Sequence, residues 1–378
     1  MLNNGTGLSE KYPLHGIKVL ELARVLAGPW AGQLLADLGA QVVKVEAPSG
    51  DETRYWGDQT SDTKLTAYFK STNRGKQSFV ADLTNSSDLE FVQTMSNKAD
   101  IIIENFKVGS LKKFKLDYAN IKRRNPKIIY CSITGFGQSG PYSFRPGYDF
   151  IIQAMGGIMD LTGDLDGEPQ KPGVAYADIF TGLYSVVAIQ SALINRRKSN
   201  KGTHIDMSLF DSQLAVLANQ ASTFLETGKI PKRMGNTHPV IVPYQKFETA
   251  DGSIIIACGN DRQFAKLCKA MGWKLHESKA FSTNQARLLN REKLIPLMEK
   301  KLISKSKKSI IEKLGWVGVP CGTINTVKEA LTDPQAHYRK MIRKIEGVEV
   351  IRTPILYNSL KLKYDHPAPA LGQHTSEI

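Results

Sequence analysis

Residues 16–46 read GIKVLELARVLAGPWAGQLLADLGAQVVKVE, and this stretch decides the fold. Residues 16–22 read as a β-strand. Residues 29–38 read as a helix, which opens at Pro29 and closes at Gly39. Residues 41–46 read as a second strand. The order strand, helix, strand predicts a βαβ unit, in which a helix connects two parallel strands.

The same alternation continues along the N-terminal half. Further strands are predicted at 78–83, 100–104 and 127–132, and further helices at 88–97 and 118–124. This predicts an α/β fold, with a large Rossmann-like domain whose mainly parallel sheet has helices on both faces. Ligands of such sheets bind beyond the carboxyl ends of the strands, so the loops at Arg24, Asn73, Asn105 and Thr134 form one candidate rim.

The alternation of predicted strands and helices changes near residue 225. Residues 244–258 predict a hairpin that turns at Asp251 and Gly252, and helical patterns follow at 262–271, 290–304 and 307–314. We therefore expect a smaller α+β domain at 225–325 and a linker helix region at 201–224. Residues 1–200 and the closing segment 330–378, which includes a strand-like stretch at 348–352, are expected to form the large domain together.

Composition limits the functional classes. The 378 residues include 50 Lys and Arg against 36 Asp and Glu, a net charge of +14, so an anionic partner is expected. The chain has no zinc-finger spacing, RNP-type motif or arginine-rich arm, so a phosphate-bearing small molecule fits better than nucleic acid. The four cysteines lack metal-ligand spacing, and no metal site is predicted. The first eleven residues do not resemble a secretory signal and no apolar run approaches a membrane span, so we expect a cytoplasmic protein without a membrane partner.

Asp178 stands at the start of a long apolar segment. Residues 179–195 are apolar nearly all round and predict a helix buried in a sizeable core. At this position Asp178 is expected to be the N-cap, which accepts the free amides of the first turn. The positive end of a helix also keeps a carboxylate ionised, and only the ionised form attacks a carbonyl. Position alone leaves both roles open, a structural cap and a nucleophile.

The rim loops have compositions suited to a long ligand. The first turn, RVLAGPWAG (24–32), lacks the GxGxxG pattern, and Pro29 removes one amide, which disfavours a nicotinamide cofactor. NRGKQS (73–78) is either a simple turn or a site whose cations hold phosphates. ENFKVG (104–109) combines an amide, an aromatic ring and a lysine, and the glycines of TGFGQSGPY (134–142) allow close approach to the backbone. Coenzyme A, with an anionic nucleotide end and an uncharged arm, is such a ligand.

Taken in order, these segments resemble the class III CoA-transferase family, also called the CaiB/BaiF family. The matching stretches are 16–54, NRGKQS (73–78), IENFKVGSL (103–111), 132–163, GVAYADIFTGLYSVVAIQSAL (173–193), KGTHIDMSLFDS (201–212) and LGQHTSEI (371–378). They cover almost the whole chain. Residues 235–268 look most like the succinate-hydroxymethylglutarate, or glutarate, CoA-transferases, which implies a short dicarboxylate substrate.

The resemblance implies a two-domain fold, an interlocked homodimer, and coenzyme A as substrate and product with no tightly bound cofactor. It also implies that Asp178 is the nucleophile. The residues at positions that contact CoA in relatives are Arg24, Val25, Leu26, Ala27, Asn73, Arg74, Lys76, Asn105, Phe106 and Lys113. Lys113 replaces an arginine of some relatives. Leu26 replaces a glutamine of formyl-CoA transferase, which argues against formyl or oxalyl specificity.

The implied reaction moves CoA from an acyl-CoA to a free carboxylic acid. Asp178 forms a mixed anhydride with the donor acyl group, and the CoA thiolate then converts it to an aspartyl thioester that the acceptor acid attacks. Candidate oxyanion donors are the first amides after Asp178 and those of Gly135 and Gly137. Tyr148 either lines the acyl pocket or belongs to the core. The cations that are candidates for a distal carboxylate are Arg24, Arg145, Arg233 and His238.

Two other functions remain open from the sequence. The α-methylacyl-CoA racemases share this fold, but they carry a histidine where this chain has Tyr148, and a neutral phenol is a poor base near pH 7. A non-catalytic acyl-CoA-binding protein is the second alternative.

Overall fold

The structure is a computed structural model that describes residues 12–59 and 65–378. The first eleven residues, which the localisation expectation used, lie outside the described residues. The chain divides into two compact units. The first comprises the described residues up to Met159 together with Lys171–Lys229 and Gln335–Ile378, and the second comprises Asp160–Gln170 and Ile230–Pro334.

The first unit is built on a six-stranded sheet in the order β3-β2-β1-β4-β5-β6. The strands are β1 (Lys18–Leu22), β2 (Gln41–Glu46), β3 (Gln77–Val80), β4 (Ile101–Glu104), β5 (Ile129–Thr134) and β6 (Thr203–Ser208). Every neighbouring pair is parallel. The expected α/β fold with a parallel sheet is confirmed. The chain changes direction across the sheet between β1 and β4, the switch point at which ligands of such sheets bind.

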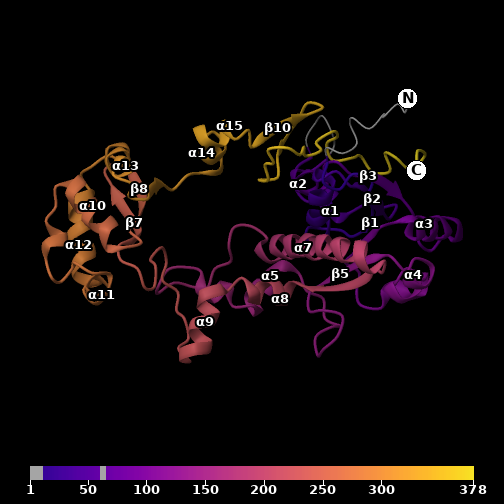
Figure 1. Ribbon diagram of the computed structural model, residues 1–378, viewed down its shortest axis with the longest axis horizontal. Coiled ribbons are helices and arrows are strands. Elements are labelled where there is room, and N and C mark those ends of the chain that lie inside the picture. The colour runs from indigo at the N-terminus through magenta and orange to yellow at the C-terminus, as the bar shows by residue number, and fades with distance from the viewer. Residues whose placement is uncertain (1–11, 60–64) are drawn as a thin grey trace. The chain divides into compact units, whose positions relative to one another are not determined.

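Helices cover both faces of this sheet, with α1 and α7 on one face and α3 and α4 on the other. The helices of the first unit up to residue 227 are α1 (Ala27–Asp37), α2 (Ala67–Asn73), α3 (Ser86–Lys98), α4 (Tyr118–Arg124), α5 (Asp149–Met155), α6 (Ile158–Leu161), α7 (Tyr176–Ser199), α8 (Leu209–Ala215) and α9 (Ala218–Thr227), with short 3₁₀ turns η2 (Glu52–Tyr55) and η3 (Ser110–Phe114). In Figure 1, α7 runs along the sheet close to α1.

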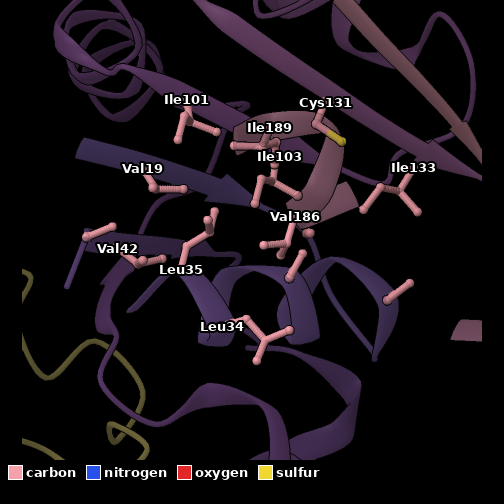
Figure 2. Packing of buried hydrophobic residues seen from close by; sticks show 14 of the residues in the cluster. Val19, Leu34, Leu35, Val42, Ile101, Ile103, Cys131, Ile133, Val186 and Ile189 are labelled. Carbon is pink, nitrogen blue, oxygen red and sulfur yellow. The ribbon is translucent and has the colours of Figure 1, made fainter. Parts of the chain in front are cut away.

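Strand alternation divides the apolar side chains between two cores. On β4, Ile101 and Ile103 join the cluster formed by α1 and α7, whereas Ile102 joins the cluster of α3 and α4. Figure 2 shows Ile103 packed near Val186 and Ile189 of α7, with Leu35 of α1 below. The central strands β1, β4 and β5 are thus buried on both faces, as the continuous apolar run at 101–103 in β4 requires.

Helix α7 differs from the expectation in two ways. It is 24 residues long, and by length and composition it is apolar enough to cross a membrane, contrary to the expectation that no run approaches such a span. One face of α7 packs into the apolar core through Val186 and Ile189, as the sequence predicted for a buried helix. Its outer face is not buried within the chain, because Val187 and Ile194 are exposed.

The expected linker at 201–224 is wrong in part, because residues 203–208 form β6 and pair with β5 along its full length. The two strands lie side by side in the parallel sheet, so this segment belongs to the first unit.

The closing segment of the chain also belongs to the first unit. It contains α15 (Pro334–Tyr338) and the hairpin of β10 (Ile342–Ile345) and β11 (Val348–Ile351). The last residues of the chain lie beside β3, and the backbone N–H of His374 donates to the carbonyl oxygen of Ser78 at 3.1 Å.

The second unit has its own sheet and core. The strands β7 (Tyr244–Thr249), β8 (Gly252–Ala257) and β9 (Cys321–Thr323) form an antiparallel sheet, and β7 and β8 are the hairpin expected at Asp251 and Gly252. The helical elements are α10 (Asp261–Met271), η4 (Leu275–Glu277), α11 (Asn284–Leu289), α12 (Arg291–Leu302), α13 (Lys307–Trp316) and α14 (Val327–Leu331). A separate apolar cluster, which includes Phe247, Phe264 and Leu294, holds this unit together.

Candidate active site

A pocket of about 160 Å³ opens at the switch point of the parallel sheet. Its walls are the loop 24–27 after β1, the loop 105–108 after β4, residues 133–135 at the end of β5, residues 143–149, Asp178 and Leu209. All of these residues belong to the first unit. The sheet topology therefore brings three of the four predicted rim loops together.

Asp178 supplies a carboxylate to this pocket from the first turn of α7. It is 8% exposed, and burial, followed by the negative charge of Asp149, raises the pKa of Asp178 to about 7. The expectation that Asp178 is the N-cap is wrong. The helix starts at Tyr176 after the cap residue Ala175, so Asp178 lies inside the first turn.

Asp149, which sequence reasoning missed, takes the place of the cap. One of its oxygens, Oδ1, accepts the backbone N–H of Asp178 at 3.1 Å, and Oδ2 accepts Nε2 of Gln153 at 2.6 Å. Burial raises the pKa of Asp149 as well, while the amide donors oppose that rise. The only signal in the sequence is an acidic residue directly after Tyr148, at the start of an apolar helix.

The loop after β1 is held in a strained conformation by polar contacts. Asn105 accepts the backbone N–H of Arg24 at 3.0 Å and donates its own Nδ2 to the Arg24 carbonyl at 2.7 Å. Val25 has a φ of 70°, which is rare for a β-branched residue, and its N–H donates to Asp51 at 3.2 Å. Helix α1 then begins at Ala27 without a side-chain cap, so within residues 12–59 and 65–378 its first amides have no side-chain acceptor beside the pocket.

Comparison with known proteins decides the family of this chain. The model of CoA-transferase family III matches residues 14–375. The chain belongs to CoA-transferase family III. The expected class III CoA-transferase is thereby confirmed, and the chain is an enzyme of the transferase class.

Relatives of this family are similar over nearly the full chain. The succinate–glutarate CoA-transferase of Agrobacterium fabrum is 46% identical, over 98% of this chain and 96% of its own. The human succinyl-CoA:glutarate CoA-transferase is 40% identical, over 97% of this chain and 85% of its own. Among solved structures, a CaiB/BaiF family protein from Brucella suis is 52% identical with a TM-score of 0.90, over 98% of this chain and 99% of that one.

In this family III chain, four of the ten residues expected to bind CoA do not line the pocket, and three of the four are buried. Asn73 is fully buried and accepts Lys76 Nζ at 2.9 Å. Lys76 is also paired with Glu21 at 2.8 Å, and Arg74 forms a buried ion pair with Asp37. These side chains are engaged inside the protein, so the structure does not support direct contact between them and the ligand.

The other expected CoA residues are mostly at the pocket. Arg24, Val25, Leu26, Ala27, Asn105 and Phe106 line it. The N–H of Phe106 donates to Glu104 at 2.9 Å, and burial raises the pKa of Glu104 to about 7. Lys113 is not a lining residue, and its ammonium lies 4.6 Å from the ring centroid of Phe114.

The expected oxyanion donors are partly occupied. The N–H of Gly137 donates to Thr134 Oγ1 at 3.0 Å, and the N–H of Asp178 donates to Asp149. Gly135 lines the pocket. The uncapped start of α1, at Leu26 and Ala27, is a donor set that the sequence did not suggest.

The four residues expected to bind the distal carboxylate of the substrate divide between the pocket and the second unit. Arg145 and the half-exposed Tyr148 line the pocket, and the Arg145 guanidinium lies 4.7 Å from the ring centroid of Tyr142. Arg24 lines it too but pairs with Glu52. Arg233 and His238 belong to the second unit, where Arg233 pairs with Asp160 at 2.9 Å. His238 accepts the backbone N–H of Val240 at 3.2 Å.

Tyr68 is a second residue that sequence reasoning missed. It projects from α2 with its ring 5.4 Å from that of Trp56. Burial, followed by the charges of Asp178 and Asp149, raises the pKa of Tyr68 to about 12. The phenol is therefore a neutral donor within electrostatic range of both carboxylates.

Proposed function

We propose that this family III CoA-transferase exchanges CoA between succinyl-CoA and glutarate, or a closely similar short dicarboxylate, with Asp178 as the nucleophile. One observation supports Asp178 as the nucleophile. Its buried carboxylate lines the pocket, and its pKa is raised to about 7. The substrate class follows from the names of the two relatives that are 46% and 40% identical over almost the full chain.

The chemistry proceeds by acyl exchange at one carboxylate. An Asp178 oxygen attacks the thioester carbonyl of succinyl-CoA, the C–S bond breaks, and CoA thiolate leaves a succinyl–aspartyl anhydride. The thiolate attacks the Asp178 carbonyl carbon and expels succinate, which gives an aspartyl–CoA thioester. Glutarate attacks this thioester and releases the thiolate, which then attacks the glutaryl carbonyl. This step forms glutaryl-CoA and regenerates the Asp178 carboxylate.

The pocket suits each step of this cycle. A carboxylate with a pKa near 7 is more basic, and so a better nucleophile, than an exposed aspartate. The amides at the start of α1 are available to developing oxyanions. Burial restricts water, which would hydrolyse either anhydride.

Arg145 is the residue we propose for the distal carboxylate of the acid. It lines the pocket, and its guanidinium forms no ion pair with any of the described residues, whereas Arg24 already pairs with Glu52. A guanidinium binds a carboxylate in a bidentate manner. Arg145→Met should therefore raise the KM for glutarate more than the KM for succinyl-CoA in steady-state assays, and equal changes would refute this assignment.

An exchange assay tests the proposed function. Succinyl-CoA and free glutarate are incubated with the enzyme, and the CoA esters are separated by mass. Glutaryl-CoA should appear only when both substrates are present, and hydroxylamine should trap a hydroxamate at Asp178. Failure to form the CoA ester of glutarate or of any other short dicarboxylate, or scrambling of an α-centre in a 2-methylacyl-CoA without added acid, would overturn the proposal.

We also propose the interlocked homodimer for this chain. The outer face of α7 is apolar and exposed at Leu183, Tyr184, Val187 and Ile194, an unusual surface for a helix in a lone soluble chain. Light scattering on the purified protein should give twice the mass of one chain, and a monomer would refute this proposal.

A further inference from the structure

The start of α7 is stabilised by a residue from another helix. The first amides of a helix have no partner within it, and they normally stabilise a carboxylate in the first turn. Here Oδ1 of Asp149, the first residue of α5, accepts the N–H of Asp178 at 3.1 Å. Asp149 therefore accepts the hydrogen bond of the backbone N–H that belongs to Asp178 itself.

The orientation of Asp149 is fixed from its other side. Its Oδ2 accepts Nε2 of Gln153, one turn further along α5, at 2.6 Å. Gln153 is fully buried, and its Nε2 also donates to the carbonyl oxygen of Val174 at 3.3 Å, just before α7. Oε1 of Gln153 has no hydrogen-bond partner among the described residues. The two acidic residues thus belong to one linked arrangement of α5 and α7.

The surroundings of Asp178 do not compensate its charge. Burial and the charge of Asp149 are the influences on its pKa, and both raise it. The titratable groups around this pair include Tyr68 of α2, Asp51 and Lys171, and the pocket residues Arg24, Lys107, Arg145 and Tyr148. Helices α1 and α8, which also pack near α7, contribute only Ala27 and Leu209 to the pocket.

We propose that Asp149 is a positioning residue that orients Asp178 and keeps its carboxylate basic, by taking the α7 amide and placing a like charge beside it. This inference rests on the proposed role of Asp178 as nucleophile. In this arrangement Asp178 is held by its backbone, while its side chain stays free to attack. Neither Asp149 oxygen needs to touch the substrate.

Asp149→Asn separates charge from hydrogen bonding. The asparagine keeps an oxygen for the Asp178 N–H, and its amide group can donate to Oε1 of Gln153 once that side chain flips. Removal of the charge should lower the pKa of Asp178. The acid limb of the kcat profile should then move to lower pH by roughly one unit. At pH 8.5 the less basic nucleophile should lower kcat several-fold, with KM values for both substrates nearly unchanged.

Two further variants complete the test. Asp149→Ala removes the acceptor as well and should lower both kcat and the melting temperature. Glu90→Gln makes the same charge change on the exposed surface of α3 and should keep the wild-type profile. An Asp149→Asn enzyme whose acid limb stays at the wild-type pH would overturn the proposal.

A readout independent of turnover separates this inference from the proposed function. A carbodiimide with an amine nucleophile modifies protonated carboxyl groups, and mass spectrometry follows the modification of Asp178 as a function of pH. The midpoint should be lower in Asp149→Asn than in the wild type, and equal midpoints would contradict the role of Asp149. If the midpoint shifts but the wild type exchanges no CoA, the electrostatic coupling stands and the proposed function fails.

Discussion

The first unit contains two buried groups of charged side chains, and they are built in opposite ways. The network below the loop after β1 contains three carboxylates and three cations, Glu21, Glu46, Asp51, Lys44, Arg54 and Lys76. Lys44 lies 2.9 Å from Asp51, and Arg54 lies 2.6 Å from Glu46. The pair at the start of α7, Asp149 and Asp178, has two carboxylates and no directly bonded cation among the described residues.

The pKa values follow this difference. In the network, burial alone would raise the pKa of Glu46 and Asp51, but hydrogen bonds and nearby cations lower both overall. At the pair, burial and like charge act together and raise the pKa of Asp178 to about 7. Compensated charges therefore maintain the architecture under the loop, while the uncompensated carboxylate is available for chemistry.

The largest effect should come from removing the uncompensated nucleophile. Asp178→Ala should lower the rate of CoA exchange by at least about a thousandfold, because it removes the carboxylate on which the acyl intermediate is proposed to form. CoA affinity, measured by calorimetry, should change little. A variant that retains a tenth of wild-type exchange would show that the pocket works without covalent chemistry.

Breaking the compensated network should affect folding instead. Lys44 is 1% exposed at its side chain and also donates to the Ala23 carbonyl at 2.6 Å. Lys44→Met leaves buried carboxylates without their partner, so we expect the free energy of unfolding to fall by about 3 to 5 kcal/mol in urea titrations. The exposed Lys308, which pairs with Glu312 on α13, is the matched control, and Lys308→Met should leave the unfolding transition unchanged. Equal stability of the two variants would refute the structural role of the network.

The uncompensated pair should reduce stability at neutral pH. The pKa of Asp178 is about 7 in the folded chain, against 3.8 for an ordinary aspartate in an unfolded chain. Below pH 4 the carboxyl is protonated in both states. Between pH 4 and 7 only the unfolded chain ionises, so stability falls as the pH rises, and the full cost remains above pH 7.

Asp178→Asn removes this titration and should stabilise the protein by roughly 2 to 4 kcal/mol at pH 8. The gain should disappear as the pH falls toward 4, as followed by urea unfolding over that range. Glu90→Gln, an exposed change of the same kind, should show no such trend. A gain that is independent of pH would contradict an unfavourable buried charge at position 178.

Local patterns predicted most elements of the fold. The strand at 41–46 and the hairpin turn at Asp251 and Gly252 are where the sequence places them, because period and turn chemistry are local properties. The switch-point pocket also followed, since strand order brings the loops after β1, β4 and β5 together.

Contacts between distant residues were beyond such reasoning. The bond from Asp178 to Asp149 spans 29 residues, and without it Asp178 is the natural candidate for a cap. NRGKQS looks like a phosphate loop until Arg74 and Lys76 meet Asp37 and Glu21, which lie 37 and 55 residues earlier. A cation in a sequence reveals its charge but not its partner, and the partner decides whether it binds a ligand.

The smallest expected effect comes from Val25, which connects the compensated network to the pocket. It tests whether the contact from Asp51 to Val25 helps the pocket bind acyl-CoA. Asp51 holds the N–H of Val25 at a φ of 70°, a conformation that strains a β-branched residue and suits glycine. Val25→Gly should stabilise the chain by about 1 kcal/mol or less, since the freedom of glycine when unfolded offsets part of the relieved strain. The KM for acyl-CoA should rise a few-fold because the loop is no longer confined. Ala218→Gly relieves a φ of 48° outside the pocket and should change stability alone, so equal KM values for the two variants would show that the strain at Val25 does not serve binding.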